Sequence, residues 1–242
     1  MFFVKFIIEK FNCEIISVSQ SLKKSLVEDG GLNYKNIKVI YNGISVNNRK
    51  KIDNKKKIII KKNSIGIFGR IEERKGHHVL LKSWKLIQKK IPNIYLYIVG
   101  NGENKYVKNL KAFIKSQKFN LNKIVWLNYT NDIYSLLKQI GVVVVPSVSY
   151  ESFGRIAVEA MALKKPVITS DFGGLKEINK NKTTGFVVSK NNSQLLANKI
   201  IELMQNKNKR LLYGINGYKN YKKNFTSLKM ANNYYDFIKK KL

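Results

Sequence analysis

Acidic residues, cysteine and metal-binding patterns are scarce in this 242-residue chain. Asp and Glu number 15 against 46 Lys and Arg, which gives a formal charge of +31. The single cysteine, Cys13, excludes an intramolecular disulfide and fits a reducing compartment. The sequence contains no Asp-x-Asp element of the kind that holds a metal ion.

Long apolar runs are also missing. The first eight residues are apolar, but they are too short to span a bilayer and carry no small-residue cleavage site. Together with the cysteine count, this favours a cytoplasmic location. Peripheral contact with the inner face of the membrane stays open.

A strongly basic chain ordinarily indicates nucleic acid or an anionic membrane as its partner. Here the excess is almost wholly Lys, spread over every segment, whereas a nucleic-acid footprint concentrates on one face. No nucleic-acid motif with interleaved aromatic residues is present, so nucleic acid is not expected as a partner. A basic nucleic-acid or membrane-surface binder on a reused fold remains the alternative.

Apolar strands alternate with amphipathic helices along most of the chain. This βαβα order predicts an α/β fold with a Rossmann-like, doubly wound parallel sheet, whose ligands bind at the carboxyl ends of the strands. The expected strands include residues 65–68, 95–99, 124–127, 142–145 and 166–170.

Residues 150–162 read YESFGRIAVEAMA and give the strongest functional signal. They place Glu151 before a helix and Glu159 about 12 Å along it, at ~1.5 Å rise per residue. The first amides of a helix point outward with a partial positive charge and can bind an anion, and Gly154 would let a phosphate approach the backbone. A diphosphate between a sugar and a nucleoside fits that span.

This stretch resembles the Glu-x7-Glu signature of retaining glycosyltransferases of the GT-B fold, in the form typical of glycosyltransferase family 4. Taken alone, the two Glu residues would more often be a helix-start charge and a solvated side chain, but further family motifs follow in order. The resemblance implies that the chain is the donor-binding C-terminal half of such an enzyme. The donor-binding residues that it implies are Gly69, Asn128, Ser152, Phe153, Gly154, Arg155 and Glu159.

Upstream, a short apolar strand ends in Gly69-Arg70, and Lys75-Gly76 opens the next helix. These residues are similar to the family's Gly-Arg and Lys-Gly elements, whose cations bind the donor diphosphate. Two fixed cations can neutralise the charge on a leaving nucleoside diphosphate without a metal. The resemblance therefore implies catalytic roles for Arg70, Lys75 and Glu151, and no metal or other cofactor.

Other positions leave alternatives open. Gly173 and Gly174 either support the donor sugar or simply make the turn. Asn128 stands where the family usually has glycine, near the expected base and ribose site. His77 and His78 open a helix on the donor side, where a surface or capping role is expected.

The resemblance also implies a division of the chain. Residues 1–50 would be the remnant of an N-terminal acceptor domain with its linker, 51–217 the nucleotide-sugar-binding domain, and 218–242 helices that cross back. The Lys-rich run at 50–62 is expected to be a linker. The family's N-terminal glycine-rich loop and histidine have no counterpart, so the chain is expected to be N-terminally incomplete.

Several expectations follow from that incompleteness. The chain alone should have little transferase activity, and it would be either truncated or completed by a separate acceptor-domain chain. An exposed apolar patch is expected at Tyr221, Phe225, Met230 and Phe237. The function that the resemblance implies is retaining transfer of a hexose, from a UDP- or GDP-linked donor to a glycan or lipid-linked acceptor, in surface polysaccharide or glycolipid biosynthesis.

Overall fold

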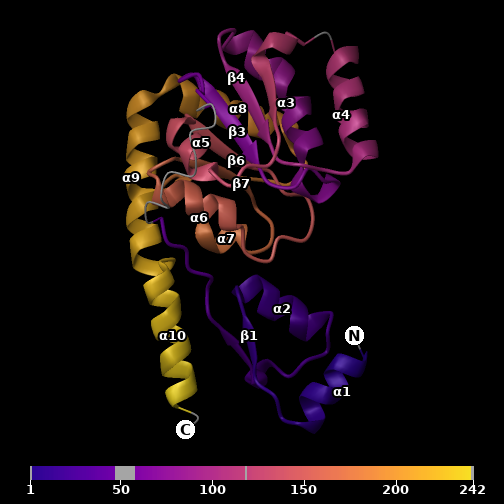
Figure 1. The fold of residues 1–242 in the computed structure, drawn as a ribbon, viewed down its shortest axis with the longest axis vertical. Coiled ribbons are helices and arrows are strands. Elements are labelled where there is room, and N and C mark those ends of the chain that lie inside the picture. The colour runs from indigo at the N-terminus through magenta and orange to yellow at the C-terminus, as the bar shows by residue number, and fades with distance from the viewer. Residues whose placement is uncertain (1, 47–57, 118, 241–242) are drawn as a thin grey trace.

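The computed structural model describes residues 2–46, 58–117 and 119–240. Figure 1 shows a larger unit built on a sheet and a smaller unit below it, with both chain ends beside the smaller one. The smaller unit contains α1 (Phe2–Lys10), β1 (Ile15–Ser17), α2 (Gln20–Glu28), a 3-10 turn (Tyr34–Asn36) and β2 (Ile37–Val39). Strands β1 and β2 pair in parallel.

The larger unit has six parallel strands in the order β5-β4-β3-β6-β7-β8. Because β3 pairs with both β4 and β6, the strand order reverses beside β3, and ligands of such sheets bind at this switch point. The predicted α/β fold with a doubly wound parallel sheet is confirmed. The strands are β3 (Ser64–Phe68), β4 (Tyr95–Val99), β5 (Ile124–Leu127), β6 (Val142–Val145), β7 (Val167–Ser170) and β8 (Gly185–Val188).

Helices cover both faces of this sheet, as its almost continuous apolar strands require. On β3, Ile65 and Ile67 face a core shared with α3 and α8, whereas Phe68 belongs to the opposite core with α5, α6 and α9. The helices of this unit are α3 (His77–Lys90), α4 (Asn104–Ser116), α5 (Ile133–Gln139), α6 (Arg155–Ala162), α7 (Leu175–Ile178), α8 (Ser193–Gln205) and α9 (Lys207–Asn224). Two 3-10 turns cover Glu73–Lys75 and Leu121–Lys123.

Helices α9 and α10 (Ser227–Lys239) run along one side of the molecule and reach the smaller unit (Figure 1). The expectation that Tyr221 and Phe225 are exposed is wrong, because both are buried. The ring of Phe225 packs edge-on against Tyr41 and Phe153, and the Tyr221 hydroxyl donates to the Ile44 carbonyl. Tyr41 and Ile44, in the chain between the two units, supply this cover together with Phe153 of the larger unit.

No helix in the described ranges is long and apolar enough to cross a membrane. Most of the Lys-rich run predicted as a linker at 50–62, and the predicted boundary at residue 50, lie outside the described residues. The division of the chain into three segments stays a prediction.

Candidate functional site

Glu151 lies in the loop after β6 and is buried in an ion pair. Its Oε2 atom is 2.7 Å from the Lys75 ammonium nitrogen and accepts a hydrogen bond of 3.0 Å from the Ser147 hydroxyl. Only 9% of the Glu151 side chain is exposed, against 22% for Lys75. A carboxylate at this depth costs free energy unless it is paired, and here one oxygen meets both a cation and a hydroxyl.

Glycine at position 76 brings Lys75 to this point. Gly76 follows the 3-10 turn at Glu73–Lys75 with a left-handed φ of 72°, and an added Cβ there would lie 1.9 Å from the Pro146 carbonyl oxygen. Only a residue without Cβ lets the start of α3 approach the end of β6 so closely. The predicted catalytic residues Lys75 and Glu151 therefore lie together.

Three further glycines lie in or against the loop that carries Glu151. Gly154 is the N-cap of α6 with φ 98°, and a Cβ there would meet Leu175 Cδ2 at 2.4 Å. A Cβ on Gly173, whose φ is 56°, would lie 2.1 Å from the Glu151 carbonyl oxygen, which accepts a hydrogen bond from the Gly174 amide. Close packing against the Glu151 loop thus accounts for both Gly173 and Gly174.

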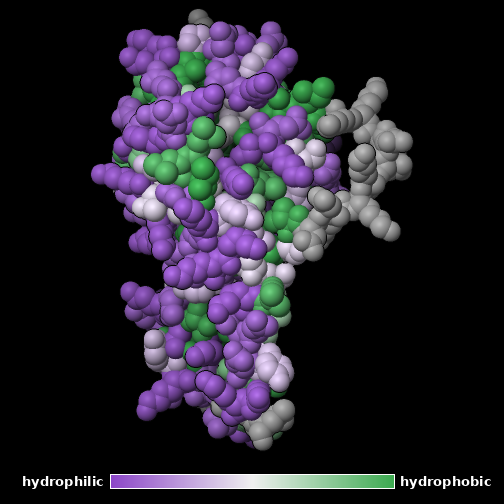
Figure 2. Space-filling view, turned by 90° about the vertical axis from the view of Figure 1, so that its left-hand side faces the viewer, coloured by the Kyte–Doolittle hydropathy of each residue, from purple (hydrophilic) through white to green (hydrophobic). Residues whose placement is uncertain are grey.

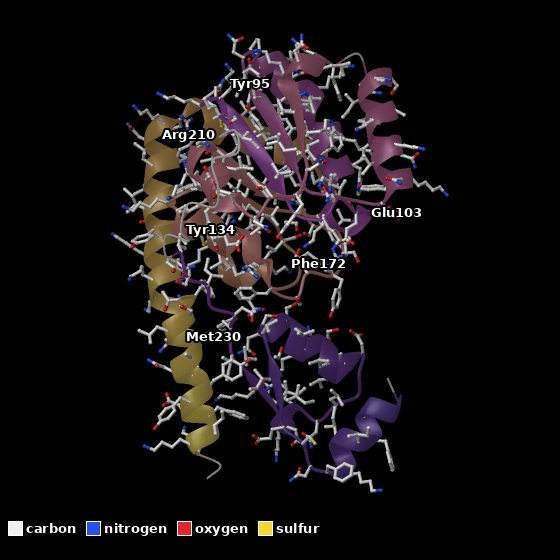
Figure 3. All side chains as sticks on the ribbon, in the orientation of Figure 1. Tyr95, Glu103, Tyr134, Phe172, Arg210 and Met230 are labelled. Carbon is white, nitrogen blue, oxygen red and sulfur yellow. The ribbon has the colours of Figure 1, made fainter. Side chains whose placement is uncertain are left out.

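Glu159 lies on the second turn of α6 and is also buried. The Arg155 Nε atom, one turn earlier on α6, donates to Glu159 Oε1 at 2.8 Å, although 69% of the arginine side chain is exposed. The Tyr134 hydroxyl, labelled in Figure 3, donates to the same oxygen at 3.5 Å. The negative charge of Glu159 raises the pKa of the Arg155 guanidinium.

Arg70, Gly69 and Asn128 lie at the carboxyl edge of the sheet and are exposed. Arg70 forms no hydrogen bond or ion pair with the other described residues, so its guanidinium is free to meet a ligand. Gly69 has φ 126°, and an added Cβ there would have nothing within 4 Å. Beside Asn128, the Tyr129 amide donates to the Asn101 side chain at 3.0 Å.

A cavity of about 640 Å³ opens between the two units. Glu151, Ser152 and Phe172 line it from the larger unit, and the first turns of α2 line it from the smaller one (Figure 3 labels Phe172). Lys75, Arg70 and Glu159 are not among its lining residues. The structure therefore brings Glu151 to an interunit cavity and leaves Arg70 and Glu159 outside it.

The surface role expected for His77 is wrong. Its side chain is 1% exposed, and neither ring nitrogen has a hydrogen-bond partner among the described residues. Burial is the main cause that lowers the pKa of His77 to about 4. His78 is less buried and shares a hydrogen bond with the Tyr106 hydroxyl. His77 directly follows Gly76 at the start of α3 and is buried there. The sequence pattern did not indicate this burial.

Two supporting side chains were missed in the sequence. Ser147 follows the Pro146 that ends the β6 run, so its place at the carboxyl edge could have suggested a role. Tyr134 comes from α5 and reaches Glu159 across 25 residues, and a single sequence gives no signal for that contact. Within the described residues, no group of three or more His, Cys, Asp or Glu side chains is placed to hold a metal ion.

Comparisons with known proteins agree on one family. A family model described as "Glycosyl transferases group 1" matches residues 48–220. The capsular polysaccharide biosynthesis glycosyltransferase CapM of Staphylococcus aureus is 30% identical over 241 residues, covering 93% of this chain and 62% of CapM. An uncharacterized glycosyltransferase of Methanocaldococcus jannaschii is 32% identical over 200 residues, covering 77% of this chain and 49% of its own length.

Solved structures show the same relationship. The Anabaena protein HepE, crystallised in complex with UDP-glucose, is 26% identical with a TM-score of 0.83, and the match covers 94% of this chain and 64% of HepE. The C-terminal domain of LpcC, a group 1 family protein of Francisella tularensis, is 28% identical with a TM-score of 0.64, covering 70% of this chain and 89% of that domain. This chain spans about half to three-fifths of the length of the curated relatives above.

Proposed function

Because this chain belongs to the group 1 glycosyl transferases, we propose that it binds a UDP- or GDP-linked hexose at the carboxyl edge of its six-stranded sheet. The observation that carries the proposal is the buried Lys75–Glu151 pair beside the switch point, with exposed Arg70 at the end of the adjacent strand. The complexes of HepE with UDP and with UDP-glucose support a nucleotide-sugar donor.

In the proposed complex, Arg70 and Lys75 bind the diphosphate. A guanidinium offers a planar pair of donors and an ammonium a point charge, so together they stabilise the charge that develops on the leaving group. Glu151 and the amides of Phe153 and Gly154 hold the sugar hydroxyls. Those two amides donate no hydrogen bond to the described residues.

Glu159 accepts from the ribose diol in this proposal, with Arg155 and Tyr134 fixing its carboxylate. Asn128, at the end of β5, lies toward the base, and Gly69 leaves open space for the ligand beside Arg70. The two cations replace a metal ion in binding the diphosphate, so donor binding is proposed to be independent of divalent metal.

The transfer itself is proposed to retain the configuration of the hexose and to deliver it to a glycan or lipid-linked acceptor. Retention requires the acceptor hydroxyl on the same face from which the diphosphate leaves, so much of the rate comes from positioning. The similarity to CapM supports surface polysaccharide biosynthesis as the setting. A peripheral contact with the inner membrane face would suit a lipid-linked acceptor.

A donor-binding subunit completed by a separate acceptor-domain chain is the second candidate. The observation that favours it is the small size of the sheet in the smaller unit. In the described residues that sheet has two strands, whereas the sheet of the larger unit has six. Efficient sugar transfer by the purified 242-residue chain would decide against this candidate. Transfer that appears only when an acceptor domain is added in trans would support it.

Isothermal calorimetry with UDP and GDP, with and without EDTA, tests donor binding. We expect UDP or GDP to bind equally well in EDTA, and we expect a combined Arg70→Ala and Glu159→Gln variant to lose at least about 100-fold in affinity, since each lost charge-assisted hydrogen bond contributes about 1.5–3 kcal/mol. Lys115→Ala, which removes one exposed positive charge on α4, is the matched control. Absence of any nucleotide binding by the folded protein, or binding abolished by EDTA, would contradict the proposal.

A further inference from the structure

The amino-terminal end of α2 is held by residues from both units. The first amides of a helix have no partner inside the helix and need acceptors from elsewhere. The Ser19 hydroxyl accepts from the Leu22 amide at 3.0 Å. The amides of Gln20 and Ser21 donate to the two carboxylate oxygens of Glu177, at 2.9 and 2.8 Å.

Glu177 belongs to α7 in the larger unit, so these two bonds cross between the units. A third bond at the same place joins Glu177 to the chain that follows β2, because the Tyr41 hydroxyl donates to Glu177 Oε2 at 2.9 Å. Burial and the adjacent carboxylate raise the pKa of Tyr41 to about 12. A carboxylate at a helix start also interacts favourably with the positive end of the helix dipole.

The smaller unit contacts the loop of the candidate site at a second point. The Ser19 hydroxyl, which caps α2, also donates to the Ser152 carbonyl at 2.6 Å. Ser152 directly follows Glu151, and both line the cavity between the units together with Gln20, Ser21 and Glu177. The start of α2 is therefore tied to the loop that carries Glu151.

The Glu177 carboxylate hydrogen-bonds only to neutral groups. In the described part of the chain it forms no ion pair, and its partners are two backbone amides and a tyrosine hydroxyl. Both of its oxygens are thus bonded to residues outside the larger unit.

We propose that Glu177 is a positioning residue that fixes α2 against the Glu151 loop and so sets the shape of the interunit cavity. The consequence for catalysis rests on the proposed function, in which this cavity adjoins the donor sugar. Glu177 itself touches neither the sheet edge near Arg70 nor the Lys75–Glu151 pair, so its loss should change how the units are arranged and leave UDP binding in place.

Hydrogen–deuterium exchange tests the contact at α2. In Glu177→Ala, we expect the amides of residues 20–22 to exchange at least about 10-fold faster than in the parent protein, with α3 and α8 unchanged. Glu177→Gln, which keeps one carbonyl oxygen, should give a smaller increase. Glu28→Gln is the matched control, because Glu28 lies at the other end of α2 and pairs with Lys24 within that helix.

A distance measurement tests the arrangement of the units directly. The single cysteine, Cys13, lies in the smaller unit, so a spin label there and a second label at Lys115→Cys on α4 form a pair across the units. We expect a narrow distance distribution in the parent and in Glu28→Gln, and a broad one in Glu177→Ala. A purely local packing role would leave the distribution narrow.

A distance distribution in Glu177→Ala as narrow as in the parent would overturn the proposal, whether or not exchange at residues 20–22 changes. So would faster exchange spread over the whole larger unit, since that indicates general destabilisation. If Glu177→Ala does not fold, Glu177→Gln and Tyr41→Phe are compared with Glu28→Gln in the same exchange and distance measurements. UDP affinity is measured in parallel: failure of the parent to bind UDP contradicts the proposed function but leaves both results valid for Glu177.

Discussion

Lys75 and Glu151 form an ion pair in which each side chain compensates the charge of the other. In the proposed complex, a donor diphosphate would compete with Glu151 for the Lys75 ammonium, which is 22% exposed. Glu151 is the more deeply buried partner, so the pair matters most for the stability of its carboxylate.

A double-mutant cycle should detect this pair as an energetic coupling. We expect Lys75→Met and Glu151→Gln each to lower the free energy of unfolding, and the coupling between them to be about 1–2 kcal/mol, reduced from the value of a fully buried pair because solvent reaches Lys75. Urea denaturation of the four proteins measures it. Strict additivity would show that the two charges do not stabilise each other.

His77 makes stability depend on pH in a defined direction. Its pKa of about 4 in the folded protein is below the ordinary value of 6.5, so the unfolded chain binds the proton more readily. Stability from this residue is therefore complete above about pH 6.5 and is lost as pH falls toward 4. Between pH 7 and pH 5 the loss should be roughly 2 kcal/mol.

Urea denaturation across pH checks this expectation. Between pH 7 and pH 5, the unfolding free energy of His77→Leu should fall by roughly 2 kcal/mol less than that of the parent. His78→Gln should keep most of the parent's dependence on pH. Because the comparison uses slopes, a constant difference in stability does not affect it. Equal slopes in the parent and His77→Leu would contradict the burial argument.

At the scale of elements, the approach of the Gly173 turn to the Glu151 loop makes a glycine indispensable. A Cβ at position 173 would lie 2.1 Å from a backbone oxygen, and backbone cannot move aside as a flexible side chain can. We expect Gly173→Ala to lower the free energy of unfolding by about 2–4 kcal/mol, and to weaken UDP binding by displacing the loop.

Gly217→Ala on α9 is the matched control. A Cβ there would lie 3.1 Å from Met161 Cγ, on a flexible side chain, and alanine favours a helix interior by up to about 1 kcal/mol. Its stability should change by no more than about 1 kcal/mol. If both substitutions had the same small effect in thermal unfolding, the close approach at Gly173 would not matter.

The elements that were predictable are those with a local signal. The run Val142–Val145 between a helix and a Pro-Ser pair, and the ESFG turn before α6, indicate a buried strand, a loop and a helix start from their own residues. The pairing of Glu177 with α2 was not predictable, because it joins positions about 157 residues apart and depends on how the two units pack. The same holds for Tyr134 and Glu159.

At the scale of the whole molecule, the basic residues are spread along the whole sequence and are not gathered in one segment. Figure 2 shows a largely hydrophilic face with hydrophobic groups at several places in its upper and lower parts. The exposed apolar residues of α9 are Leu211, Leu212 and Ile215. Lysines precede and follow these three residues along the helix, and α9 contains no acidic residue.

This distribution predicts only weak, sequence-independent binding to polyanions. Lysines scattered over the molecule cannot all contact one nucleic acid, so few counterions are released per complex, and binding is weak with a shallow dependence on salt. In a filter-binding assay with single-stranded RNA at 0.15 M salt, we expect a dissociation constant no tighter than about 1 μM, the typical range of non-specific binding. UDP should not displace the RNA, because most lysines lie outside the proposed nucleotide site at the sheet edge. Tight, sequence-dependent binding that persists at this salt, in a protein without UDP affinity, would instead make the basic surface the functional one.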